Sequence, residues 1–175
     1  RPAILWNDSR SEKECVYLNE TFGRKRMSKL SGNVAFAGFT LPKILWLKEK
    51  EPQNFAQIFK VLLPKDYLNY RLTGVYATDH SDASGTLLYD PFRRGWSDEL
   101  LSLTGLDKTV LPPISPSSSF IGRLKRDLAA ELGLNDDVQV VAGCADNAGA
   151  ALGLGILREG EAMLSLGTSG TILLP

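Results

Sequence analysis

An aspartate and an asparagine, Asp146 and Asn147, follow a short apolar strand expected at 138–141 and precede a run of small residues that ends near Gly153. A carboxylate at such a strand end lies close to the free amides of a helix terminus, a geometry that suits a general base. A lone aspartate at this position is also typical of a helix N-cap. The spacing alone leaves both roles open.

A second glycine-rich segment, Gly167-Thr168-Ser169-Gly170, interrupts an apolar strand that we expect from Ala162 to Leu166 and that resumes at Thr171. Glycines beside hydroxyl side chains allow backbone N–H groups to approach a phosphate closely. The alternative is an ordinary hairpin turn. The tetrapeptide therefore indicates a phosphate loop only if other residues of a phosphate-transfer site accompany it.

The elements that would position these residues alternate between helices and strands, which predicts an α/β domain. Prolines open two of the helices and Gly23 and Gly74 end two of them. The expected helices lie at 11–22, 41–51, 53–59, 64–73, 96–104 and 126–132, and further strands are expected at Ala3–Trp6, Lys60–Leu63 and Leu87–Tyr89.

The composition of the 175 residues is that of a globular protein, with 43% hydrophobic and 23% charged residues and a formal net charge of zero. No apolar run reaches the roughly 18 residues that cross a bilayer, so we expect no membrane partner. The one basic run, Arg24-Lys25-Arg26, favours a solvated face over nucleic-acid binding. Two cysteines outside any metal-ligand spacing favour a reducing compartment, the cytoplasm, and Cys144 is interpreted as a structural thiol rather than a nucleophile.

Six motifs in chain order resemble the FGGY family of carbohydrate kinases, and the resemblance covers nearly the whole chain. The motifs are Leu5-Trp6-Asn7-Asp8-Ser9-Arg10, Gly38 to Leu47, Leu62 to Gly74, Asp79 to Thr86, Gly143 to Ala148, and Leu166 to Gly170. The resemblance implies a ribonuclease-H-like, actin-like ATPase fold. It also implies that residues 1–175 are an incomplete N-terminal, sugar-binding domain, without the family's Asp-x-Gly-Thr phosphate hairpin and without its nucleotide-binding domain.

By the same resemblance, the activity is ATP-dependent phosphorylation of a sugar, with ATP and Mg²⁺ as cofactors. Asp146 would be the general base, and Asn147 would hydrogen-bond substrate hydroxyls. Trp6 and Asp8 would line the sugar pocket, and the 167–170 loop would bind the phosphates of ATP. No residue of this chain is assigned as a metal ligand.

Each remaining candidate residue has a structural interpretation beside the functional one. Trp6 could belong to the core, and Arg10 is expected in a capping or surface ion pair. Lys43 and Trp46 are assigned to packing, because a helical i, i+3 pair needs no ligand to explain it. Asp66 could point into a cleft or simply favour the start of its helix.

The segment from Asp79 through Asp82 to Thr86 would border the substrate pocket, and it lacks the alternation of a Ca²⁺ loop. His80 is expected to be exposed. The motif wording favours D-xylulose as the acceptor, with gluconate, ribulose and glycerol as alternatives. A non-catalytic, actin-like sugar-binding or scaffold protein is the alternative from another class. The isolated fragment is expected to be inactive, and a homodimer is one open possibility.

Overall fold

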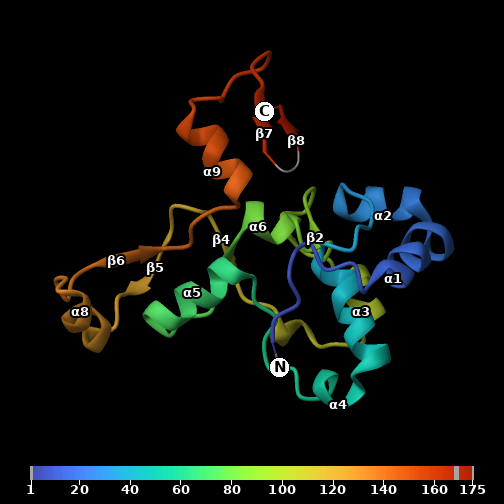
Figure 1. The fold of residues 1–175 in the computed structure, drawn as a ribbon, viewed down its shortest axis with the longest axis horizontal. Coiled ribbons are helices and arrows are strands. Elements are labelled where there is room, and N and C mark those ends of the chain that lie inside the picture. The colour runs from blue at the N-terminus through green and yellow to red at the C-terminus, as the bar shows by residue number, and fades with distance from the viewer. Residues whose placement is uncertain (1, 168–169, 175) are drawn as a thin grey trace. The chain divides into compact units, whose positions relative to one another are not determined.

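The structure is a computed structural model that describes residues 2–167 and 170–174. It divides into two compact units, residues 1–143 and residues 144–175. Figure 1 shows the helices and strands of each unit. The helices of the first unit are α1 (Glu12–Val16), α2 (Arg24–Ser31), α3 (Thr40–Lys50), α4 (Pro52–Phe55), α5 (Pro64–Thr73), α6 (His80–Ser84), α7 (Asp98–Thr104) and α8 (Arg126–Leu132), with a π-helical segment at Tyr17–Gly23 and a 3₁₀ turn at Lys108–Val110.

The strands of the first unit form three two-stranded sheets within the described residues. β1 (Thr78–Asp79) pairs in parallel with β4 (Ile114–Ser115). β2 (Tyr89–Asp90) pairs with β3 (Gly95–Trp96), and β5 (Phe120–Arg123) pairs with β6 (Gln139–Val141), both in antiparallel register. The second unit consists of α9 (Asp146–Gly153) and the antiparallel hairpin of β7 (Met163–Leu166) and β8 (Gly170–Leu173).

Apolar side chains from α1, α2, α3 and α7 form the core of the first unit. The fully buried members include Met27, Leu41 and Leu100. Leu87 and Leu88 join this core from the segment that leads into β2. Because Leu87 is a buried leucine with a positive φ of 60°, the strand expected at Leu87–Tyr89 begins only at Tyr89.

Helix boundaries marked by proline and glycine are confirmed. α5 begins at Pro64 and ends at Gly74, whose φ is +82°. α8 has the expected bounds, and α3 ends before Pro52. The prediction of one α-helix at 11–22 is wrong in one respect. The second half of this segment is π-helical, and a further helix, α2, follows Gly23 directly.

Two of the expected strands are wrong. In the Ala3–Trp6 segment, the amide of Asp8 turns back onto the carbonyl of Leu5 at 3.2 Å, so the chain forms a turn. The Lys60–Leu63 segment makes a single inter-segment bond of this kind, from the Val61 amide to the Val110 carbonyl at 2.9 Å, and no ladder. Both segments are apolar, but neither has a neighbouring strand among the described residues with which to pair.

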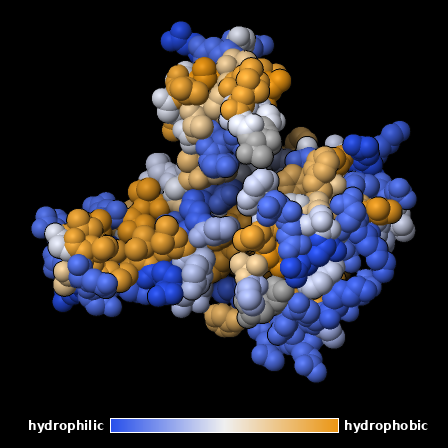
Figure 2. Space-filling model, viewed as in Figure 1, coloured by the Kyte–Doolittle hydropathy of each residue, from blue (hydrophilic) through white to orange (hydrophobic). Residues whose placement is uncertain are grey.

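Hydrophobic residues also reach the surface, and Figure 2 shows them gathered over β5, β6 and α8 and, separately, over the second unit. They include Phe120, Leu132 and Val141 in the first unit and Leu164, Leu166 and Ile172 in the second. Among the described residues, no helix combines the length and apolarity that crossing a membrane requires.

Candidate functional site

Asp146 is the first residue of α9 and its side chain is exposed. Ala145 occupies the N-cap position, so the interpretation of Asp146 as the helix cap is wrong. One carboxylate oxygen, Oδ1, accepts the backbone amide of Asn147 at 2.7 Å. No ion pair of Asp146 occurs within the part of the chain that the structure describes. The second oxygen, Oδ2, takes no part in that hydrogen bond.

Small residues allow α9 to pack against the turn that precedes it. A Cβ built on Gly149 would lie 3.0 Å from the Sγ of Cys144, so any side chain there would displace the thiol. Cys144 is half-buried in this contact, which agrees with its interpretation as a structural thiol. The small-residue composition of this segment thus serves close packing next to Asp146 and Asn147.

The predicted phosphate loop includes the residue after β7 and the first residue of β8. Leu166 pairs with Gly170, and Gly167 is exposed. Thr168 and Ser169 lie outside the described residues. The pairing of Leu166 with Gly170 fits both the phosphate-loop and the simple-turn interpretations.

The loop that carries Trp6 is fixed to the start of α3 by its backbone. Lys43 Nζ donates to the carbonyls of Leu5 and Gly38, both at 2.8 Å. A Cβ on Gly38 would lie 2.8 Å from the carbonyl oxygen of Trp6, so only glycine allows this approach. Trp6 itself is 76% exposed, and its interpretation as a core residue is wrong. An exposed indole on an anchored loop offers a flat apolar face to a ligand.

Asp8 lies two residues further along the same loop and forms a forked ion pair with Arg10. The hydrogen bonds from the Arg10 side chain lower the pKa of Asp8 to about 2, with smaller contributions from the Arg10 amide and the Lys43 charge. The Arg10 guanidinium also lies over the ring of Trp46, 4.8 Å from its centroid. The surface ion pair expected for Arg10 and the packing role of Trp46 are confirmed.

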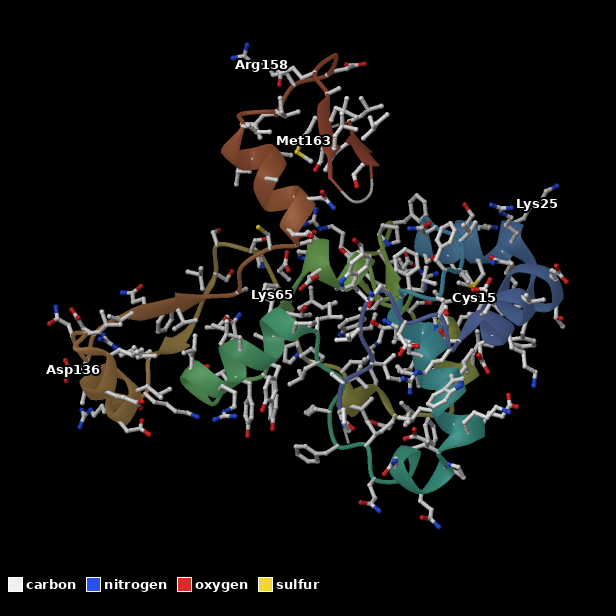
Figure 3. All side chains as sticks on the ribbon, in the orientation of Figure 1. Cys15, Lys25, Lys65, Asp136, Arg158 and Met163 are labelled. Atoms are coloured by element: carbon white, nitrogen blue, oxygen red, sulfur yellow. The ribbon has the colours of Figure 1, made fainter. Side chains whose placement is uncertain are left out.

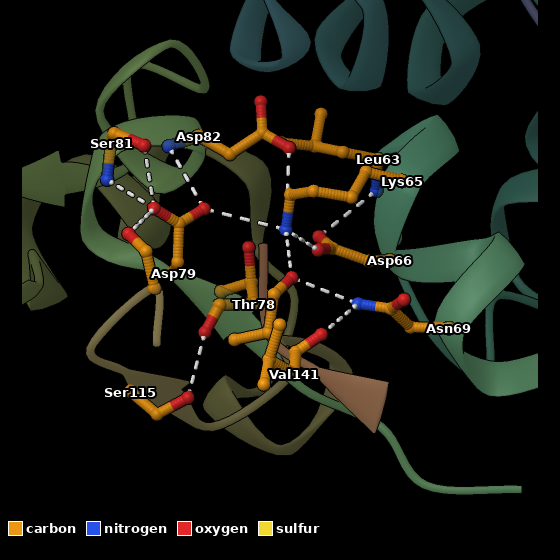
Figure 4. A network of polar contacts seen from close by, with 12 residues as sticks. Leu63, Lys65, Asp66, Asn69, Thr78, Asp79, Ser81, Asp82, Ser115 and Val141 are labelled. Atoms are coloured by element: carbon orange, nitrogen blue, oxygen red, sulfur yellow. Dashed lines mark hydrogen bonds and ion pairs between the residues drawn. The ribbon is translucent and has the colours of Figure 1, made fainter. Parts of the chain in front are cut away.

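A buried charge cluster surrounds Lys65, and Figure 4 shows its contacts. The ammonium group lies 2.8 Å from Asp66 Oδ1, 3.3 Å from Asp79 Oδ1 and 3.6 Å from Asp82 Oδ2. Asp66 and Asp79 are fully buried. Asp66 therefore points into the protein rather than into a cleft, and internal hydrogen bonds hold the 79–86 segment. In the described residues, no group of His, Cys, Asp and Glu has the geometry of a metal site.

Sequence patterns missed this cluster, although each of its carboxylates stands near the start of a helix. Asp66 is in the first turn of α5, Asp79 caps α6 and Asp82 is in the first turn of α6. The start of a helix is enough to explain each carboxylate by itself. The sequence therefore gives no sign that all three share Lys65 as a partner. His80, expected to be exposed, is instead half-buried, and its Nδ1 lies 2.8 Å from the hydroxyl of Tyr89.

The structure thus places Asp146 and Asn147 side by side on α9, and Trp6 and Asp8 together on one anchored loop. The first pair belongs to the second unit and the second pair to the first unit. Each pair presents polar or aromatic groups at the surface of its own unit.

Comparison with known proteins completes the description of the site. Residues 1–153 match the family model of the FGGY family of carbohydrate kinases, N-terminal domain. The chain is 44% identical over 171 residues to the xylulose kinase of Lactococcus lactis subsp. lactis and 46% identical over 170 residues to that of Escherichia coli. These alignments cover 98% and 97% of this chain and 34% of each relative.

Solved structures give the same picture. A xyloylose kinase from Brucella ovis matches with a TM-score of 0.91 and 45% identity, over 98% of this chain and 35% of that one. A gluconate kinase from Lactobacillus acidophilus matches with a TM-score of 0.92 and 27% identity, over 96% and 34%. The chain spans about a third of the length of the curated relatives that it matches.

Proposed function

Because the chain belongs to the FGGY family of carbohydrate kinases, we propose that it is part of the sugar-binding, N-terminal domain of an ATP-dependent sugar kinase that converts D-xylulose to D-xylulose 5-phosphate. Its α/β fold is the actin-like ATPase fold of that family, as predicted. The choice of D-xylulose as the substrate is supported by the 44–46% identity, over almost the whole chain, to relatives named xylulose kinase.

Asp146 is the proposed general base. As the sugar hydroxyl attacks the γ-phosphorus of ATP, its proton passes to the carboxylate, the new P–O bond forms and the bond to the ADP leaving group breaks. The Asn147 amide holds Oδ1, which orients the carboxylate and leaves Oδ2 for the proton. A strongly basic group is unnecessary, since positioning and charge stabilisation supply most of the catalysis in a loose phosphoryl-transfer transition state.

Asn147, Trp6 and Asp8 are the proposed sugar contacts. The side-chain amide of Asn147 can donate a hydrogen bond to one sugar hydroxyl and accept one from another. Trp6 offers its exposed ring to the carbon chain of the sugar. Arg10 lowers the pKa of Asp8 to about 2, so the carboxylate is ionised at neutral pH, and a carboxylate oxygen can accept a hydrogen bond from a sugar hydroxyl.

The proposed ATP contacts are the backbone amides of the 167–170 loop. Gly167 and Gly170 are both exposed and have no side chain to cover their own amides, which fits the chemistry of a phosphate ligand. Mg²⁺ would neutralise charge on the transferring phosphates. We assign no ligand for it in this chain. A cytoplasmic location is proposed from the two free thiols, Cys15 and Cys144, and the homodimer stays an open prediction.

The full-length kinase tests this function in a coupled assay of ATP consumption, with D-xylulose, D-ribulose, L-ribulose, gluconate and glycerol as acceptors. The expected result is a kcat/KM for D-xylulose at least ten times that for any other acceptor. Preference for gluconate would indicate a gluconate kinase of the same family, an alternative favoured by the structural match to a gluconate kinase. ATP consumption that no acceptor stimulates would support a non-catalytic sugar-binding or scaffold protein.

A further inference from the structure

The first unit ends at Ala142 and Gly143, and Asp146 follows Ala142 by four residues. We call Ala142 and Gly143 the root of the Asp146 segment. Hydrogen bonds hold the amides of both residues and the carbonyl of Ala142. The Ala142 amide donates to the Ser119 carbonyl at 3.0 Å, and the Gly143 amide donates to the Ser117 carbonyl at 2.9 Å. Ala142 is fully buried. The chain therefore leaves the first unit from a fixed point.

Two side chains of α5 hold the carbonyl of the same root. Lys65 Nζ donates to the Ala142 oxygen at 3.0 Å, and Asn69 Nδ2 donates to it at 2.8 Å. Both donors reach it from α5, as Figure 4 shows beside the labelled Val141. A main-chain carbonyl at the end of a strand thus receives a charged and a neutral hydrogen bond, and charge-assisted bonds are the stronger kind.

Asp79 contacts both Lys65, which donates to the Ala142 carbonyl, and Ser117, whose carbonyl accepts the Gly143 amide. Its Oδ1 lies 3.3 Å from Lys65 Nζ, and its Oδ2 accepts the Ser117 hydroxyl at 2.8 Å. Burial alone would lower the pKa of Lys65, but the hydrogen bond that Lys65 donates to Asp66 and the charges of Asp66, Asp82 and Asp79 raise it. The ammonium group therefore stays charged, and it can leave Ala142 only by uncovering buried carboxylates.

Gly143 shows how closely Lys65 fits the root. Its φ is +77°, and a Cβ there would lie 3.0 Å from Cδ of Lys65. Gly133, at the end of α8, has a similar φ of +67° but nothing within 4 Å of its Cβ position. The two glycines share the same backbone preference and differ in their contact with Lys65.

We propose that Lys65 is a positioning residue for Asp146: through the Ala142 carbonyl and Asp79, it fixes the point from which the segment that carries the base departs. The inference rests on the proposed function in naming Asp146 as the base. Lys65 needs no contact with substrate for this role. A displacement of about 1 Å in a reacting group can cost on the order of 100-fold in rate, so movement of the root would lower kcat.

The test uses the full-length kinase with Lys65→Met, Gly143→Ala and, as a matched control, Gly133→Ala. We expect the first two variants to lower kcat at least 10-fold while KM for D-xylulose and for ATP changes less than about 3-fold. Gly133→Ala, with the same backbone strain, should keep kcat within 2-fold of the unaltered protein. Should Lys65→Met fail to fold, Gly143→Ala keeps the test decisive. A folded Gly143→Ala variant with unchanged kcat would overturn the proposal.

Amide hydrogen exchange of residues 142–147 provides a readout that does not need sugar turnover. Both root variants should exchange this segment at least 10-fold faster than the unaltered protein, whereas the Gly133→Ala variant should not. If the unaltered kinase consumes no ATP with any sugar, the proposed function fails, and the exchange data alone decide whether Lys65 holds the root. Unchanged exchange in both root variants would refute the proposal that Lys65 holds the root.

Discussion

Arg10 binds both carboxylate oxygens of Asp8: its Nε lies 2.9 Å from Oδ1 and from Oδ2, and its Nη2 lies 2.7 Å from Oδ2. The Arg10 amide adds a further bond to Oδ1 at 3.0 Å. The pair fixes the direction of the Asp8 side chain on the loop that exposes Trp6. It also keeps the carboxylate ionised at every pH at which a kinase would be assayed.

Replacement of Arg10 by Met should return the pKa of Asp8 from about 2 to the ordinary range near 4, because the side-chain hydrogen bonds from Arg10 are the main cause of the lowering. A lowered pKa contributes stability that is present above the unfolded-state pKa and is lost as the pH falls through the folded-state value. The variant should therefore lose the part of the acid dependence of stability that falls between about pH 4 and pH 2.

The measurement is an NMR titration of the Asp8 carboxyl carbon. Lys13→Met is the control, since Lys13 pairs with Glu49 at 3.0 Å and makes no ion pair with Asp8. Asp8 should still titrate at about 2 in that variant. An Asp8 pKa near 2 in Arg10→Met would show that another group holds the carboxylate.

Replacement of Gly38 by Ala should raise KM for the sugar about 10-fold, which corresponds to roughly 1.4 kcal/mol of lost binding. The new Cβ would lie 2.8 Å from the Trp6 carbonyl, so the loop that carries Trp6 and Asp8 must move. Gly95→Ala is the matched control, because the nearest atom to its Cβ position is a carbonyl oxygen 4.0 Å away. Steady-state kinetics measure KM for the sugar in both variants. Equal KM values would show that Trp6 and Asp8 are not part of the sugar site.

Replacement of Asp79 by Asn should lower the free energy of unfolding by about 3 kcal/mol, the low end for breaking a buried ion pair. Asp79 is fully buried and accepts from Ser81 and Ser117 as well as contacting Lys65. These hydrogen bonds and the Lys65 charge outweigh desolvation and lower its pKa, so the stability that its ionised form contributes is lost as the pH falls below about 4.

Urea unfolding at pH 7 and at about pH 2 to 3, below the unfolded-state pKa of an aspartate, measures this effect. Asp98→Asn is the control, since its ion pair with Lys108 is exposed and its removal should change the unfolding free energy by less than about 0.5 kcal/mol. Equal losses in the two variants at pH 7 would mean that the buried cluster contributes no more than a surface pair.

Helices were predictable where proline or glycine fixes the backbone, as at Pro64 and Gly74 of α5. The apolar segments at 3–6 and 60–63 were wrongly predicted as strands, because strand formation depends on a partner that local composition does not reveal. The roles of Asp146 and Asn147 rest on the family resemblance and stay a prediction, and the structure places both residues at the start of α9.

The cluster around Lys65 could not be predicted from sequence, since its contacts join residues far apart in the chain. Asp79 lies 14 positions from Lys65, and Ala142 lies 77 positions from it. Lys65 and Asp66 read locally as the first turn of a helix, which the macrodipole explains without any partner. Only tertiary structure shows that one ammonium group bridges three carboxylates and a main-chain carbonyl.

Asp146→Asn in the full-length kinase tests whether Asp146 is the general base. Asp136→Asn is the matched control, because Asp136, labelled in Figure 3, is an exposed aspartate in the connection between α8 and β6. We expect Asp146→Asn to lower kcat with D-xylulose by about 10²- to 10⁴-fold, the usual contribution of a general base, with KM for ATP unchanged. Asp136→Asn should leave kcat within 2-fold. A folded Asp146→Asn enzyme that retains most of its kcat would contradict the account.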